Sequence, residues 1–194
     1  MRTCFFLLAL AMSAHLYSQS VNFSTSIGYA TVKKNDYRGM AVANNNGLTV
    51  DFRINNYWMI ETGVAANNLR FHSIGNKLLV HEQLLQLPLS LKHEVPLGKH
   101  TALSIQAGGY IYWLVQEKAF NNELGQSVKG RSNLGNTAGG YFGLGFQTKV
   151  VRNWNFIAAI VNQLDLIANY KKQEDQLTAN STLLQIGFQY RVFR

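Results

Sequence analysis

The chain has 194 residues and a formal net charge of +8, yet only 14% of its residues are charged. An ordinary soluble domain has roughly 25% charged residues. The length suits one domain, and glycine is plentiful while proline occurs only twice. This composition favours β-structure with limited contact with water over an ordinary soluble domain.

The first 18 residues have the layout of a secretory signal peptide. Arg2 forms a short positive segment, an unbroken apolar run covers residues 5–12, and small or polar residues follow. The run is shorter than the roughly 20 apolar residues of a spanning helix. We expect cleavage after Ser18, which leaves a mature domain of residues 19–194. Cys4 is the single cysteine and lies within this segment, so the mature domain uses no disulfide.

Apolar and polar residues alternate over eight segments of the remaining chain, which predicts eight β-strands. Tight turns are expected at Asn55-Asn56 and at 151–153, and a moderately short link at 93–100. The other four links are long, at about 33–45, 68–79, 116–138 and 168–180. Short links at one end and long links at the other are the layout of an outer-membrane barrel. The predicted strands cover about 21–32, 46–54, 57–67, 80–92, 101–115, 139–150, 154–166 and 181–193.

A soluble barrel with an apolar interior also alternates, so other features must decide which row faces outward. Small polar residues dominate the polar row and suit a narrow interior. Aromatic residues gather near strand ends, as in the two girdles of a membrane barrel; they are Trp58, Trp154 and Tyr190 at one end and Tyr29, Trp113 and Phe142 at the other. We therefore predict an all-β, eight-stranded antiparallel up-and-down transmembrane β-barrel in the outer membrane.

The strand charges support this orientation and form the main candidate site. Four acids and four bases lie opposite the apolar rows, and such a balance suits a lumen where buried ions must pair. Two roles are open for this lumen charge network: a plug that locks the wall, or a gate whose rearrangement opens a narrow pore. An eight-stranded barrel leaves little free lumen, which favours the plug. The eight residues are Asp51, Arg53, Glu61, Glu82, Lys92, Lys149, Asp165 and Arg191.

The last strand, TLLQIGFQYRVFR, resembles the C-terminal signal that barrel-assembly machinery recognises in its clients. The matching residues are Gln185, Gly187, Tyr190 and Val192, although this chain continues past Val192 for two residues. The resemblance implies the assembly machinery as a partner during biogenesis.

The segments LLQLPLSLKHEV and LSIQAGGYIYWLV resemble two strands of the Bacteroidetes outer-membrane β-barrel family, which is called PorT-like or porin-family. Pro88, Gly108 and Tyr110 carry this likeness, and AGGYFGLGF resembles the glycine-rich strand that follows. The resemblance implies an eight-stranded barrel of the OmpA and OmpX type in the outer membrane. It does not imply transport.

No catalytic or metal-binding pattern stands out. A lipid-modifying barrel enzyme would need a serine, a histidine and an acid together, and the candidates are His72 beside Ser73 and His81 beside Glu82. Neither pair forms a recognisable triad, and the histidines lack zinc spacing. We expect no enzymatic activity, no cofactor and no metal.

Basic residues outnumber acids ten to five in the four long links. They are either a solvated surface or contacts to outer-membrane lipid and lipopolysaccharide phosphates; an exported protein has no nucleic-acid partner. The predicted function is a monomeric structural or surface-interaction barrel with a closed lumen. The alternatives are a narrow passive channel for small solutes and, third, a soluble periplasmic ligand-binding barrel. The ten bases are Lys33, Lys34, Arg38, Arg70, Lys77, Lys118, Lys129, Arg131, Lys171 and Lys172.

Overall fold

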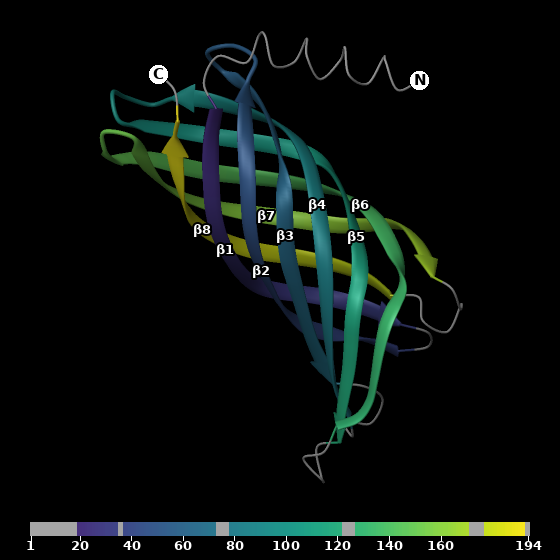
Figure 1. Cartoon of the computed structure of the whole chain (residues 1–194). Helices are drawn as coiled ribbons and strands as arrows, with labels where there is room; N and C mark the ends of the chain where they lie inside the picture. The colour runs from purple at the N-terminus through teal and green to yellow at the C-terminus, as the bar shows by residue number, and fades with distance from the viewer. Residues whose placement is uncertain (1–18, 35–36, 73–77, 122–126, 171–176, 193–194) are drawn as a thin grey trace, which may run out of the picture.

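The computed structural model is a closed barrel in which eight strands pair in sequence order, with β1 against β8 (Figure 1). It describes residues 19–34, 37–72, 78–121, 127–170 and 177–192, so the predicted signal peptide lies outside the described part. The strands are β1 (Gln19–Lys34), β2 (Tyr37–Arg53), β3 (Trp58–His72), β4 (Leu78–Pro96), β5 (Thr101–Asn121), β6 (Ser127–Val151), β7 (Trp154–Tyr170) and β8 (Leu177–Arg191). The predicted fold class is confirmed.

In the described part of the chain, no helix is long and apolar enough to cross a membrane.

The strands are strongly tilted. A path across paired residues that starts at Arg53 on β2 and crosses every strand returns to β2 at Ala43. This offset of ten residues in an eight-stranded barrel corresponds to a strand tilt of about 40°. The tilt places residues from distant strands at the same height in the lumen, which decides which side chains meet there.

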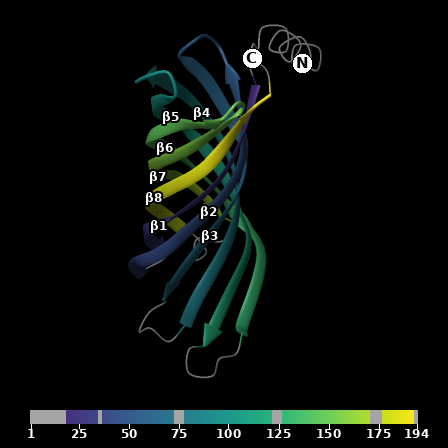
Figure 2. The same cartoon turned by 90° about the vertical axis from the view of Figure 1, so that its left-hand side faces the viewer.

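Two ends of the barrel are used below as reference points. The turn end contains the connections 54–57, 97–100 and 152–153, the start of β1 and the end of β8. The loop end contains the ends of β1, β3, β5 and β7 and the starts of β2, β4, β6 and β8. Figure 2 shows β5 and β6, the longest strands, running together to the loop end. In outer-membrane barrels the short turns face the periplasm.

The four long links predicted from the sequence are wrong in extent. The strands continue through most of each link: β6, for example, begins at Ser127 rather than near 139. The bases placed in these links therefore lie partly on strand ends, including Lys33, Arg38, Arg70 and Lys118, whereas 77, 171 and 172 lie outside the described residues. Phe142 is consequently a mid-strand residue and not part of a girdle at the loop end.

The predicted turn at Asn55-Asn56 forms because an asparagine side chain caps it. The Asn55 Oδ1 atom accepts hydrogen bonds from the backbone N–H groups of Tyr57 and Trp58, both at 2.9 Å. Asparagine is favoured in turns for this kind of local hydrogen bond. The turn reverses the chain and starts β3 at Trp58, so that Met59 and Glu61 face the lumen.

The apolar rows face outward, as predicted. Large hydrophobic side chains are exposed along every strand, among them Leu85, Leu87, Leu89 and Leu91 on β4. At the turn end, the Trp154 and Tyr190 rings pack at 5.0 Å between centroids, and Trp58 is also exposed. An outward apolar wall with aromatic residues at its edge is the surface of a membrane-spanning barrel.

Replacing Leu89 with Arg tests this orientation. Leu89 is 60% exposed near mid-height, where an arginine facing lipid lowers stability by about 2–4 kcal/mol. We expect that loss in urea titrations of the barrel folded into vesicles, with folded and unfolded forms separated by their gel mobility. The control is Leu97→Arg, since Leu97 is 61% exposed but lies in a turn. Equal stability of the two variants would contradict a lipid-facing wall.

Candidate functional site: the closed lumen

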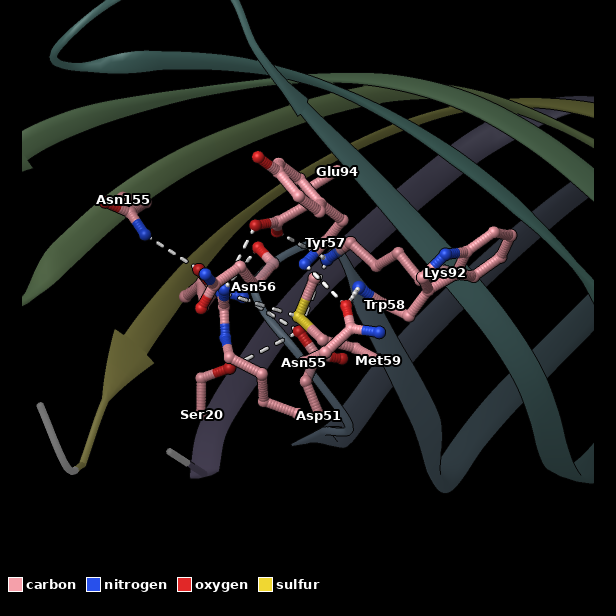
Figure 3. Close-up of polar contacts among 12 residues, drawn as sticks. Ser20, Asp51, Asn55, Asn56, Tyr57, Trp58, Met59, Lys92, Glu94 and Asn155 are labelled. Carbon is pink, nitrogen blue, oxygen red and sulfur yellow. Dashed lines mark hydrogen bonds and ion pairs between the residues drawn. The ribbon is translucent and has the colours of Figure 1, made fainter. Parts of the chain in front are cut away.

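A network of charges fills the lumen at the turn end (Figure 3). The Lys92 Nζ atom on β4 lies 3.3 Å from Asp51 Oδ2 on β2 and 3.7 Å from Glu94 Oε1. Arg53 Nη2 lies 3.3 Å from Glu94 Oε2 and its Nη1 donates to the Asn56 carbonyl at 3.0 Å. Lys92, Asp51 and Glu94 are buried, so these charges offset one another away from bulk water.

Polar side chains from neighbouring strands complete the shell around Asp51. Its carboxylate accepts hydrogen bonds from Asn22 Nδ2 at 2.9 Å, Gln189 Nε2 at 2.8 Å and Ser20 Oγ at 3.3 Å. These donors come from β1 and β8, which close the barrel. Asp51 therefore joins the first, second, fourth and last strands through one side chain.

Glu61 lies directly opposite Asp51 in the β2–β3 register, which places two acids side by side. Like charges in this position repel each other. The Asn22 amide lies between them and donates to both, at 2.9 Å to Asp51 and 3.3 Å to Glu61 Oε2. Together with Lys92, this amide offsets the repulsion.

The network continues across the lumen to Arg191. With its amide nitrogen toward Glu94, Gln147 donates to Glu94 Oε1 at 3.0 Å and accepts from Arg191 Nη2 at 3.0 Å; this orientation satisfies both groups. Asn155 Nδ2 donates to Gln189 Oε1 at 2.7 Å. The polar plug, as we call this group, consists of Asn22, Asp51, Arg53, Glu61, Lys92, Glu94, Gln147, Asn155, Gln189 and Arg191.

The eight predicted lumen charges thus do not form one cluster. Five of them belong to the polar plug, with Arg53 and Arg191 joined to Lys92 through Glu94. Lys149 is exposed at the turn-end mouth. Glu82 is buried ten residues along β4 from Lys92, and Asp165 lies in the loop-end half of β7.

Glu94 was missed by the sequence analysis because 93–100 was expected to be a connection. In the structure β4 continues to Pro96, and strand alternation brings Glu94 to the same face as Lys92. The sequence offered one signal: Glu94 lies two residues after Lys92, so in a strand that continues past residue 92 it falls on the same face. The neutral members Gln147, Asn155 and Gln189 lie in predicted strands, but nothing in their sequence pattern marks them as network members.

A small polar cavity lies next to the polar plug, on the side toward the loop end. Its volume is about 50 Å³, which holds only a few water molecules. Asn45 Nδ2 donates to Gln86 Oε1 at 2.9 Å across this region. The polar lining includes Thr49, Glu61, Gln86, Gln106, Gln163 and Gln185. The cavity is a pocket for water and not a continuous passage.

Apolar side chains fill most of the loop-end half of the lumen, where Glu82 and Thr137 are also buried. Most of these apolar side chains lie in the predicted strands, whereas Ala41, Ala43, Leu69, Phe71 and Ala179 come from strand extensions that were expected to be links, and all pack into one buried cluster. We call this group the apolar plug; its aliphatic and aromatic members include Val32, Leu69, Phe71, Val80, Leu84, Leu114 and Leu183. Polar groups in this region would be costly without partners.

Asp165 is held beside the apolar plug by three donors. The Tyr110 hydroxyl donates to Oδ1 at 2.5 Å, the Tyr112 hydroxyl donates to Oδ2, and the Ala179 backbone N–H donates to Oδ2 at 2.6 Å. A side chain at Gly139 would collide with the Tyr110 ring. Asp165 therefore ties β5, β7 and β8 together inside the barrel.

The geometry does not support the candidate catalytic pair His81 and Glu82, and it leaves the pair His72 and Ser73 untested. His81 and Glu82 are consecutive in β4, so His81 points outward against Phe120 at 5.2 Å between ring centroids, whereas Glu82 is buried inside. Ser73 lies outside the described residues. Within the described ranges, no three His, Cys, Asp or Glu side chains gather to hold a metal ion.

The four residues of the predicted assembly signal lie at the closing seam. Gln185, Gly187 and Tyr190 belong to β8, which pairs with both β1 and β7, and Val192 follows the strand. Gly187 faces the lumen, while Tyr190 packs against Trp154. These residues occupy the strand that completes the barrel, and their recognition by assembly machinery stays a prediction.

Comparison with known proteins identifies the family. Neisserial surface protein A is similar in structure, with a TM-score of 0.61 and 9% identity, over 89% of this chain and 96% of that chain. OprG from Pseudomonas aeruginosa has a TM-score of 0.53 and 14% identity, over 93% of this chain and 98% of that chain. Both likenesses concern the fold alone. No curated protein matches the chain in sequence. The model of the outer membrane protein beta-barrel domain matches residues 3–191, and the chain therefore belongs to this family of outer-membrane barrels.

Proposed function

We propose that the protein is a non-conducting outer-membrane barrel with a structural or surface-interaction role. The observation that carries this proposal is the double closure of the lumen. The apolar plug fills most of the loop-end half, the polar plug fills the turn end, and a cavity of about 50 Å³ separates them. A hydrated ion would have to lose its water within the apolar plug, and apolar constrictions block conduction by dewetting.

The loop end is where a surface role would reside. Strands β5 and β6 have 21 and 25 residues, whereas a tilted strand needs only about 9–11 to cross a membrane. Their additional residues extend the wall beyond the apolar band at the end that faces outward in such barrels. The wall there would present backbone-paired strands, and not long separate loops, to external partners.

The second candidate function is a narrow passive channel. A pocket of about 200 Å³ opens at the turn end, between Arg53, Lys99, Lys149 and Arg191, and it favours entry of an anion. Passage would then require the polar plug and the apolar plug to rearrange together. The geometry does not favour the third function, a soluble ligand-binding barrel, because such a barrel needs its apolar rows inside, whereas here they face outward.

Planar-bilayer recording separates the first two functions. We expect the purified full-length barrel, verified as folded by its heat-dependent gel mobility, to give no stepwise current. An open barrel inserted under the same conditions shows that insertion is detected. The doubly shortened variant Phe71→Ala with Leu114→Ala should also stay silent, because the polar plug remains. Discrete current steps from the unmodified protein would overturn the proposal and support the channel.

A further inference from the structure

Polar residues interrupt the outward apolar wall on β1, β2 and β3. Thr25 Oγ1 donates to Asn46 Oδ1 at 2.8 Å, and Asn46 Nδ2 donates to Asn44 Oδ1 at 2.9 Å, all on the outer face. Asn44 faces Asn68 across the β2–β3 register, and Arg70 is the next outward residue on β3. Polar groups that face lipid are costly, so they mark a candidate binding site.

These residues line a hollow and not a flat surface. An apolar groove of about 590 Å³ crosses the outer wall from β7 and β8 over β1, β2 and β3 to β4, and it includes Leu48, Val64 and Ala66. A second groove of about 330 Å³ contains Asn44, Asn68 and Arg70. On β3 the outward residues pass from Val64 and Ala66 in the first groove to Asn68 and Arg70 in the second, so the two grooves adjoin along this strand.

The height of Arg70 places it at the outer membrane–water interface. A strand tilted by about 40° advances about 2.5 Å per residue along the barrel axis. Arg70 lies twelve residues after Trp58, so it is about 30 Å from the turn-end aromatic residues. The outward apolar band of such barrels is about 25 Å tall. The cation therefore lies just beyond the apolar band, and Ala66 lies within it.

We propose that these two adjoining grooves together bind a phosphorylated lipid of the outer leaflet. The Arg70 guanidinium offers a planar fork that matches a phosphate, and the Asn44 and Asn68 amides lie beside it to donate further hydrogen bonds. The acyl chain then follows the apolar groove past Ala66 toward the membrane centre. From the membrane centre outward, the residues of the two grooves are apolar, then polar, then cationic. This is the order in which the acyl chain and the phosphate of an outer-leaflet lipid would meet them.

A second copy of the chain fits the same face less well. A two-fold axis along the membrane normal would place the same patch of both copies together at equal height. Arg70 of one copy would then approach Arg70 of the other, and like charges at an interface are unfavourable. Charge complementarity therefore favours an anionic lipid.

Native mass spectrometry of the full-length protein in detergent, titrated with lipid A, tests the proposal. We expect Arg70→Gln to lower lipid A occupancy roughly fivefold, the ratio expected for one basic residue near anionic headgroups. Ala66→Phe, which fills the groove without a change of charge, should lower occupancy as well. Arg38→Gln is the matched control, because Arg38 is an exposed base near the loop end that lines neither groove. Inorganic phosphate should not displace the lipid.

Three results would overturn the proposal, whatever the conductance of the barrel. An equal loss with Arg38→Gln would show general charge attraction, and unchanged occupancy with Ala66→Phe would show that the acyl chain lies elsewhere. Dimers that form in the absence of lipid and are lost on Ala66→Phe would assign the face to a second copy. Each variant is first checked for correct folding by its heat-dependent gel mobility. Ala66→Ser is an additional control for the effect of a substitution at this position on folding.

Discussion

Replacing Lys92 with Met is expected to lower the free energy of unfolding by about 3–5 kcal/mol, the range for breaking a buried ion pair on one side. Lys92 Nζ is the buried cation between Asp51 and Glu94, at 3.3 and 3.7 Å. Its removal leaves the buried Asp51 and Glu94 carboxylates, with Glu61 beside them, without that charge. Urea titration of the barrel in vesicles, followed by gel mobility, measures the change.

Two further variants separate the effect of losing the ion pair on stability from the effect of losing the lysine side chain. Lys149→Met removes an exposed lysine at the mouth and should change stability by no more than about 0.5 kcal/mol. The double variant Asp51→Asn with Lys92→Met removes both charges, and its loss should be smaller than the sum of the single losses. If Lys92→Met and Lys149→Met are equally stable, the polar plug does not contribute to stability.

Asp165→Ala is expected to cost about 3 kcal/mol or more. The side chain accepts from two tyrosine hydroxyls and one backbone N–H, and a buried donor left without a partner costs about 1–3 kcal/mol. Because this carboxylate links side chains and backbone of β5, β7 and β8 inside the barrel, the loss should appear as earlier unfolding in the same urea titration.

The tyrosine partners provide the comparison. Tyr112→Phe removes one donor and leaves Asp165 with the Tyr110 hydroxyl and the Ala179 N–H, so it should cost only about 1 kcal/mol. Asp165→Asn keeps one acceptor oxygen and should fall between the two. A larger loss for Tyr112→Phe than for Asp165→Ala would mean that ring packing, and not the hydrogen bonds to the carboxylate, holds this region.

The strand pattern and its orientation follow from local sequence. Strand side chains alternate between two faces, so Leu85, Leu87, Leu89 and Leu91 can be assigned to one wall from the sequence alone. The low charge and the aromatic residues at strand ends then decide that this wall faces lipid. The length of each strand cannot be predicted in the same way, because β-pairing continues wherever a neighbouring strand offers hydrogen bonds. The extension of β6 back to Ser127 therefore depends on β5, and not on its own alternation.

By itself the sequence determined an eight-stranded barrel with an apolar outside and a polar, partly charged inside. Only the tertiary structure decided which inward residues meet. The shear of the barrel brings Asp51, Lys92, Glu94 and Gln189 to one height, although they are far apart in the chain, and leaves Glu82 and Asp165 at others. Alternation is a property of single strands, whereas closure of the lumen and the groove under Arg70 arise from the stagger between strands. This is why the inward faces could be predicted, and the two plugs and the groove could not.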